Sequence, residues 1–223
     1  MFVHNLDMGL ARAYLLETKA GLYLVDAGMP GMQEIVLGFM RSIGRDDLRL
    51  IFITHAHLDH YGSAAALRKL TGAPVAIHSA DAEALSLGET PLGNARGRGQ
   101  LVKYLLPLLR PFLKLEPVQP DLILKDGDLF DSFDLNASLV HLPGHTPGSS
   151  ALFVQREHAF VGDLLSTSGK PHLQKYYASD WRQIPNSLAY LQKHNPLWVY
   201  PGHGAHPLAG VELEKLSVDR KIM

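Results

Sequence analysis

The chain has 223 residues, of which 46% are hydrophobic and 19% are charged, a globular composition that excludes disorder over most of its length. Lysine and arginine together number 21 against 22 aspartates and glutamates, and the formal net charge of −1 excludes a global field that would attract nucleic acid or an anionic membrane. Cysteine is absent, which excludes disulfides, thiolate metal sites and a cysteine nucleophile, so only histidine, aspartate or glutamate could hold a metal.

The first third of the chain predicts an alternation of strands and helices. Apolar runs at 12–16 and 22–25 predict two strands that form a hairpin around Ala20 and Gly21. The elements expected after the hairpin are a helix at 32–43, a buried strand at 50–53, a helix at about 62–70 and a strand at 75–77. This order is a β-α-β-α-β unit, in which helices cover a sheet.

The rest of the chain predicts a second, strand-rich half. A Gly/Pro-rich linker and a helical segment near 100–114 precede it, and turn signals separate its short strands. The strands are expected at 122–124, 129–130, 139–140, 151–154 and 159–161, followed by a helix at about 181–193 that Asp180 caps and a last strand at 197–199. We therefore expect one α/β domain over residues 1–223, with a helical insertion at about 86–117 and two mixed sheets packed face to face inside outer helices.

Residues 101–115 form the longest apolar stretch, but prolines and charged residues interrupt it, and it is shorter than the roughly 20 residues of a membrane span. In helical projection Lys103, Arg110 and Lys114 share one face, while leucines and a phenylalanine occupy much of the rest. Three roles stay open: packing within the domain, a lid or wall for an apolar substrate or a homodimer contact, and binding to a membrane surface. The sequence starts without a basic and apolar leader, so a cytoplasmic protein is the simplest expectation.

The most informative motif is Thr-His-Ala-His-Leu-Asp-His at 54–60, between an apolar strand and a helix. Residues two apart on an extended segment point the same way, so His55 and His57 can grip one ion from one side. Asp59 and His60 lie where the chain turns into the helix, and their side chains can point to a second ion close to the first. One loop could therefore contribute to two metal sites.

Three further residues complete the candidate set. His145 lies in a turn made rigid by proline and glycine, Asp163 ends a strand, and His203 follows the last strand. Each of the three follows a strand and has a glycine neighbour. This placement predicts that they meet the histidine loop at one edge of the sheets, where strands hold the side chains and glycines permit close approach.

With these motifs in this order, nearly the whole chain resembles the metallo-β-lactamase-fold hydrolases. The resemblance implies a four-layer αβ/βα sandwich with two metal ions, usually zinc, with iron or manganese as possible alternatives. It implies one ion on His55, His57 and His145, a second on Asp59, His60 and His203, and Asp163 as a bridge between them. Asp26 matches an early aspartate of the family that supports the histidine loop without binding metal.

Two divalent ions about 3.5–4 Å apart acidify a bridging water, so hydroxide forms near neutral pH without a histidine base. Asp59 could then pass a proton to the leaving group, which would be its catalytic role. Within the resemblance, Asp163 departs from the antibiotic-hydrolysing members, and the short stretch after His203 leaves no room for a glutathione-holding domain. No basic arm suggests nucleic acid. The expected reaction is hydrolysis of a small carboxylic ester, thioester or lactone.

Other readings stay open beside this one. The fold also carries iron-dependent redox enzymes and phosphodiesterases or nucleases, and a non-catalytic metal-binding role is a third class. Tyr176 or Tyr177 could donate a hydrogen bond to a substrate carbonyl, or lie on a solvated loop. His141 is expected to be a hydrogen-bonding residue at a strand end and not a ligand, whereas His78 and His206 could line the cleft.

Overall fold

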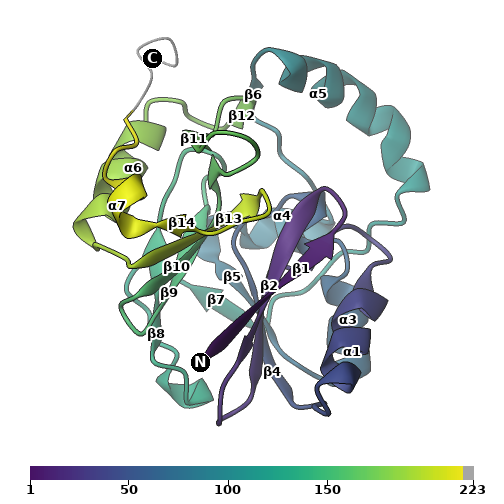
Figure 1. Ribbon diagram of the computed structural model, residues 1–223. Helices are drawn as coiled ribbons and strands as arrows, with labels where there is room; N and C mark the ends of the chain where they lie inside the picture. Colours follow the sequence, from purple (N-terminus) through teal and green to yellow (C-terminus); the bar gives the residue numbers. More distant parts are fainter. Residues whose placement is uncertain (218–223) are drawn as a thin grey trace.

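Two β-sheets pack face to face in the computed structural model, which describes residues 1–217 (Figure 1). The last six residues of the expected domain, 218–223, lie outside the described part. Aromatic and aliphatic side chains such as Tyr14, Phe52 and Phe160 fill the space between the sheets. Figure 1 shows helices α1 and α3 outside one sheet and α6 and α7 outside the other, so the predicted four-layer α/β architecture is confirmed.

The first sheet has the strand order β1-β2-β3-β4-β5-β7. Its strands are β1 (Phe2–Met8), β2 (Ala11–Glu17), β3 (Leu22–Val25), β4 (Leu48–Ile53), β5 (Val75–His78) and β7 (Leu122–Leu124). The first three strands are antiparallel, and β3, β4, β5 and β7 are parallel. Around them lie α1 (Gln33–Ser42), α2 (Leu58–Tyr61), α3 (Ala64–Thr71), the short 3₁₀ helix η1 (Ser79–Asp81) and α4 (Ala82–Leu87).

The second sheet has the order β14-β13-β10-β9-β8, with β11 paired to β10. Its strands are β8 (Ala137–His141), β9 (Ser150–Val154), β10 (His158–Ser166), β11 (His172–Leu173), β13 (Trp198–His203) and β14 (Leu208–Ala209). Helices α6 (Ile184–Lys193) and α7 (Gly210–Leu213) cover it. A separate two-stranded ribbon joins β6 (Asn94–Ala95) to β12 (Tyr177–Ala178).

Several predicted boundaries are wrong for local reasons. The strand expected at 129–130 is a single bridge from Leu129 to Ser138, because the chain turns at once into the 3₁₀ helix η3 (Asp131–Phe133). Asp180 does not cap α6, which begins four residues later; its carboxylate instead accepts the backbone N–H of Arg182. The helix expected at about 62–70 forms as α3, two residues later at its start, and the separate short helix α2, which was not predicted, precedes it and includes Asp59 and His60.

The segment near 100–114 forms α5 (Arg98–Leu109) and the 3₁₀ helix η2 (Arg110–Phe112). Pro107 lies inside α5, and Lys114 falls beyond both helices with a φ of 48°, so the predicted common face of three basic residues does not form. Figure 1 shows α5 at the edge of the molecule, apart from both sheets. Gly99 is its only buried residue, and Tyr104 (77%) and Leu108 (69%) are largely exposed, so α5 does not pack into the body along its length.

Candidate metal centre

The histidine loop follows β4 and leads directly into α2, so its side chains leave the carboxyl edge of the parallel strands. His55 and His57 lie on the loop, and Asp59 and His60 lie in α2. His55, His57 and His60 are buried, whereas the side chain of Asp59 is 20% exposed. The four predicted residues of this motif therefore converge from the histidine loop and from the helix that follows it.

The second half of the chain supplies the three other predicted residues. His145 lies in the turn between β8 and β9, and His203 is the last residue of β13. Asp163 lies inside β10, which continues to Ser166, and so does not end its strand as predicted. The continuation depends on Gly162, which adopts a φ of 50° and shifts the register of β10 against β13.

Two glycines let these strands approach the histidine loop. A Cβ atom on Gly162 would lie 2.5 Å from the Thr54 hydroxyl oxygen, and one on Gly202 would lie 2.5 Å from Cε1 of His60 and 2.6 Å from Oδ1 of Asp163. Neither position has room for a side chain. The predicted use of glycine for close approach is therefore confirmed at these two positions.

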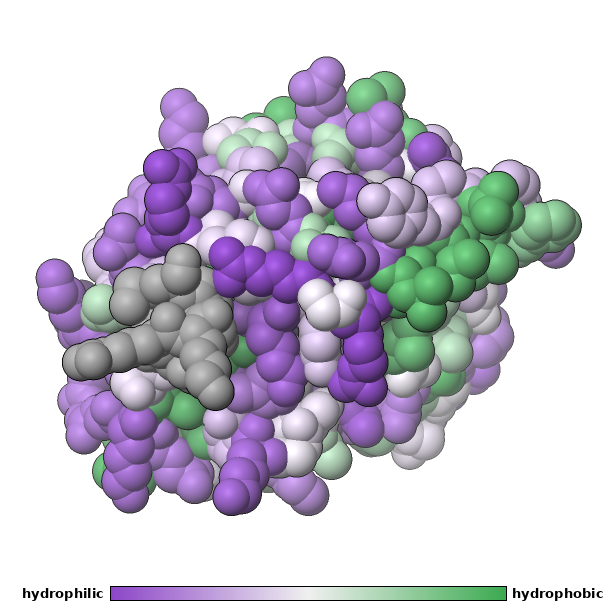
Figure 2. Space-filling model, turned by 90° about the horizontal axis from the view of Figure 1, so that it is seen from above, coloured by the Kyte–Doolittle hydropathy of each residue, from purple (hydrophilic) through white to green (hydrophobic). Residues whose placement is uncertain are grey.

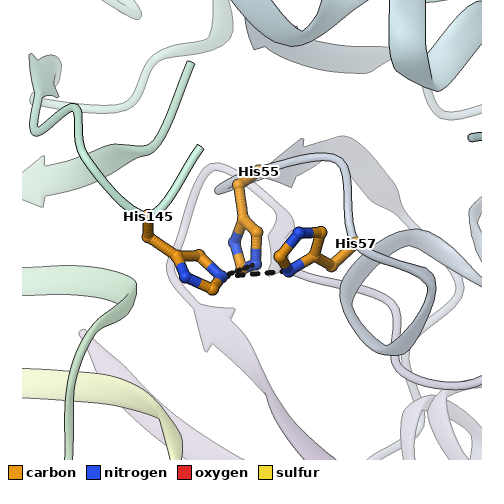
Figure 3. Close-up of side chains that lie close together, drawn as sticks. All are labelled: His55, His57 and His145. Carbon is orange, nitrogen blue, oxygen red and sulfur yellow. Dashed lines mark hydrogen bonds between the residues drawn. The ribbon is translucent and has the colours of Figure 1, made fainter. Parts of the chain in front are cut away.

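Three imidazoles converge in Figure 3, where Nε2 of His145 lies 3.1 Å from Nε2 of His55 and 3.0 Å from Nδ1 of His57. The other ring nitrogen of each histidine faces an acceptor. Nδ1 of His145 faces the Tyr177 carbonyl and Nε2 of His57 faces the Pro91 carbonyl. Nδ1 of His55 faces the Thr54 hydroxyl, whose own proton goes to Asp26.

These acceptors hold the ring protons on the outer nitrogens of the three neutral imidazoles. The three inner nitrogens then present lone pairs to one another, and no proton is left for the contacts between the rings. Lone pairs gathered at about 3 Å repel unless a cation lies among them. The donor set of this group therefore fits a metal ion.

A second group surrounds Asp163. Its Oδ1 lies 3.2 Å from Nε2 of His60, and its Oδ2 lies 3.2 Å from Nε2 of His203. The Nε2 of His203 is also 3.6 Å from the Asp59 carboxylate. The buried atoms His60 Nε2 and Asp163 Oδ1 have no hydrogen-bond partner among the described residues, and such orphaned polar atoms are costly unless something else satisfies them.

Three combinations of these residues have ligand atoms within 4.8 Å of one another and could hold a metal: His55–His57–His145, His55–His60–Asp163 and Asp59–His60–His203. Asp163 lies between the first and the third, because its Oδ2 is also 3.5 Å from Nε2 of His145. All seven predicted residues are thus brought together, and their spacing allows two adjacent ions.

The two groups differ in their electrostatics. Burial, and next the neighbouring His57, lowers the pKa of His145 to about 3, and burial with His60 lowers the pKa of His55 well below its usual value. Burial works against a charge on His203, but Asp163 outweighs it and raises the pKa of His203 to about 9. Without a metal, protons on His60 and His203 would balance Asp163; a divalent ion would displace them.

Asp26 lies beneath the histidine loop. Its carboxylate accepts one hydrogen bond from the backbone N–H of Thr54 and another from Nδ1 of His60, both at 2.8 Å. The residue adopts a φ of 59°, a conformation that aspartate tolerates better than most side chains. Asp26 therefore orients His60 through a direct hydrogen bond.

Asp81 was missed by the sequence analysis. It is 1% exposed, and its carboxylate accepts the N–H of Ala56 on the histidine loop and the N–H of Gly148 and hydroxyl of Thr146 on the His145 turn. One side chain thereby fixes both loops. A usable signal was present, because Asp81 closely follows the predicted strand 75–77, whose carboxyl end neighbours that of strand 50–53 in a parallel sheet.

A cavity of about 560 Å³ opens onto the centre and is lined by His57, Asp59, Asp163 and His203. Tyr176 and Tyr177 also line it. His78 and His206 do not line it, so the prediction that they line the cleft is wrong. The ring of His78 stacks on that of His141 with 3.9 Å between the ring centroids, and the carbonyl of His206 accepts a hydrogen bond from the Thr167 hydroxyl. His141 bonds to the Pro147 carbonyl at the end of β8, as expected of a strand-end residue.

Comparison with known proteins gives one family. The model described as "Metallo-beta-lactamase superfamily" matches residues 7–203. Human acyl-coenzyme A thioesterase MBLAC2 is 34% identical over 123 residues, 52% of this chain and 41% of that protein, so the match spans less than half of its length. Hydroxyacylglutathione hydrolase GloC of Haemophilus influenzae is 29% identical over 171 residues, 74% of this chain and 73% of that protein.

Among solved structures, the di-iron-bound form of TTHA1623 superposes with a TM-score of 0.68 at 28% identity, covering 96% of this chain and 97% of that one. No helix within residues 1–217 is both long and apolar enough to cross a membrane.

Proposed function

The chain belongs to the metallo-beta-lactamase superfamily, as its sequence resemblance implied, and on that basis we propose that it is a dinuclear metal-dependent hydrolase of a carboxylic ester, thioester or lactone. The observation that carries the proposal is the convergence of three buried imidazoles, with the Asp163 carboxylate 3.5 Å from one of them, at the wall of a largely apolar cavity. The similarity to a thioesterase and to a hydroxyacylglutathione hydrolase supports the reaction class.

The metal ligands in this proposal are His55, His57 and His145 for one ion and Asp59, His60 and His203 for the other, with Asp163 shared. Nitrogen and carboxylate donors suit Zn²⁺, Fe and Mn²⁺, and zinc is the ion we expect. When bound, two such ions supply Lewis acidity and lower the pKa of a water molecule to near neutrality.

Two side chains of the cavity complete the chemistry. Asp59 is the most exposed of the candidate carboxylates and lines the cavity, so it can carry a proton to the leaving group. Burial, together with Asp59 and Asp163, raises the pKa of Tyr177, which keeps its hydroxyl protonated. Tyr177 can therefore donate a hydrogen bond to the substrate carbonyl oxygen.

Iron chemistry is the second candidate, because the similar structure of TTHA1623 is a di-iron form and the donor set does not discriminate against iron. Protein of measured metal content, assayed on esters, thioesters, lactones and phosphodiesters, tests both. We expect two metals per chain, hydrolysis of one of the first three classes, and loss of turnover on chelation that the metal restores. Oxygen consumption by an iron form, or turnover of phosphodiesters alone, would overturn the proposal.

A further inference from the structure

The cavity beside the candidate metal centre has one wall that the mechanism does not use. That wall is α5 with the turn after it, which contributes Val102, Leu106, Leu109 and Leu113. The lining also includes further apolar residues, among them Met29 and Leu58. At about 560 Å³ the space lies within the range of small-molecule sites.

The four α5-side residues carry no polar side-chain atom. Apart from the carboxylates and imidazoles of the metal centre, the charged side chains in the lining are Arg98 and Lys175, and one further imidazole belongs to His172. Arg98 is occupied by the Tyr176 hydroxyl at 2.6 Å, and the Lys175 ammonium lies 5.4 Å from the centre of the same ring. A peptide or a sugar needs hydrogen-bonding partners along its length, which this wall does not offer. A hydrocarbon chain needs none.

Few polar contacts hold helix α5 to the body. Lys103, in the middle of the helix, donates to the carbonyl of Gly93, and Arg110, just after its last residue, donates to the carbonyl of Gly88 at 3.0 Å. Val102 is 46% exposed and Leu109 is 52% exposed, although both line the cavity. Apolar side chains left in contact with water at the wall of a binding site are stabilised when an apolar ligand covers them.

We propose that the substrate carries an acyl chain, which lies along the inner face of α5 with its carbonyl carbon at the metal centre. This assignment rests on the proposed hydrolysis and names its substrate class. The cavity determines this placement, because the α5 leucines line the same cavity as Asp59 and Asp163.

The test uses metal-loaded protein and straight-chain thioesters of one small thiol, from acetyl to dodecanoyl. We expect kcat/KM to rise about fourfold for each methylene that enters the cavity, the factor supplied by burial of about 0.8 kcal/mol per methylene. Leu106→Ser should flatten this rise, whereas Leu108→Ser should keep both the rise and the acetyl turnover. Leu108→Ser is the matched control, because Leu108 lies on the same helix, is 69% exposed and does not line the cavity.

A second readout does not depend on turnover. Titration calorimetry should show decanoate binding more tightly than butyrate, with the preference lost in Leu106→Ser and kept in Leu108→Ser. A flat chain-length profile with active hydrolysis of the acetyl thioester would overturn the acyl-chain assignment alone. Inactivity towards every thioester, with tight binding of decanoate, would overturn the hydrolysis alone. A dimer or vesicle-bound form that Leu108→Ser abolishes, with no chain-length preference, would assign α5 to a protein or lipid contact and overturn the proposal.

Discussion

Asp163 is the residue whose two carboxylate oxygens face different histidines, His60 on one side and His203 and His145 on the other. Replacing Asp163 with Asn keeps the size and removes the charge that would offset the repulsion of two cations. We expect weaker binding of at least one metal and a fall in kcat of about a hundredfold or more, measured by metal analysis and steady-state kinetics. Two tightly held metals with near-normal turnover in Asp163→Asn would show that the carboxylate does not bridge.

A different residue, His78, makes stability depend on pH. Burial, and next His141, lowers the pKa of His78 to about 4, and its Nδ1 accepts the N–H of Ala80. The unfolded chain binds this proton at about pH 6.5, so stability is full above that pH and is lost as the pH falls towards 4.

In chelated protein, unfolding by urea at pH 7 and pH 5 should show that the free energy of unfolding falls less in His78→Asn than in the unaltered chain, by up to about 2 kcal/mol. Asparagine can still accept from Ala80 but takes up no proton. An equal loss in both proteins would mean that His78 is already charged in the folded state.

At the scale of loops and strands, Asp81 ties the histidine loop to the His145 turn through Ala56, Thr146 and Gly148. In Asp81→Asn the amide would direct an N–H group at backbone donors, and both loops would shift. We expect metal affinity to fall about 10- to 100-fold, measured with a competing chelator. Glu83→Gln, an exposed carboxylate two residues away, should leave the affinity unchanged, and an unchanged affinity in Asp81→Asn would contradict the positioning role.

Elements with continuous apolar runs could be predicted from the sequence, and elements stabilised by contacts from distant segments could not. The strand at 50–53 is buried on both faces, and its carboxyl end located the histidine loop correctly. Strand β1 has polar residues at three of its seven positions and pairs at an edge, so neither a continuous apolar run nor a regular alternation marked it. Asp81 escaped notice because its three donors lie 25 to 67 residues away along the chain.

Helix α5 is an element whose existence could be predicted from the sequence, whereas its role could not. Its apolar composition was visible in the sequence, but three roles were open because helical projection cannot say which apolar face meets a neighbour. The structure leaves Tyr104 and Leu108 in solvent and turns Val102 and Leu106 towards the cavity. Figure 2 shows the resulting hydrophobic surface, in green, at the side of the molecule where α5 lies in Figure 1.

At the scale of the whole molecule, the candidate ligands come from both sheets, with His57 and His145 separated by 88 residues in the chain. Ions held between them would bind only after the two halves have docked. We therefore expect metal to slow unfolding and to leave the folding rate nearly unchanged. Stopped-flow measurements in denaturant, with and without metal, check this. If metal accelerated folding by as large a factor as it slowed unfolding, the site would form before the two halves dock.

The same arrangement sets how long an ion stays. The side chains of Asp59 and His203 are partly exposed, whereas His55, His57 and His145 are buried, so the two ions would differ in their access to solvent. The exchange of labelled metal should then have two phases, a fast one for the ion nearer the cavity and a slow one that keeps pace with the opening of the fold. The ion on the buried histidine trio would be the slowly exchanging one, so its rate of release would report how often this part of the fold opens.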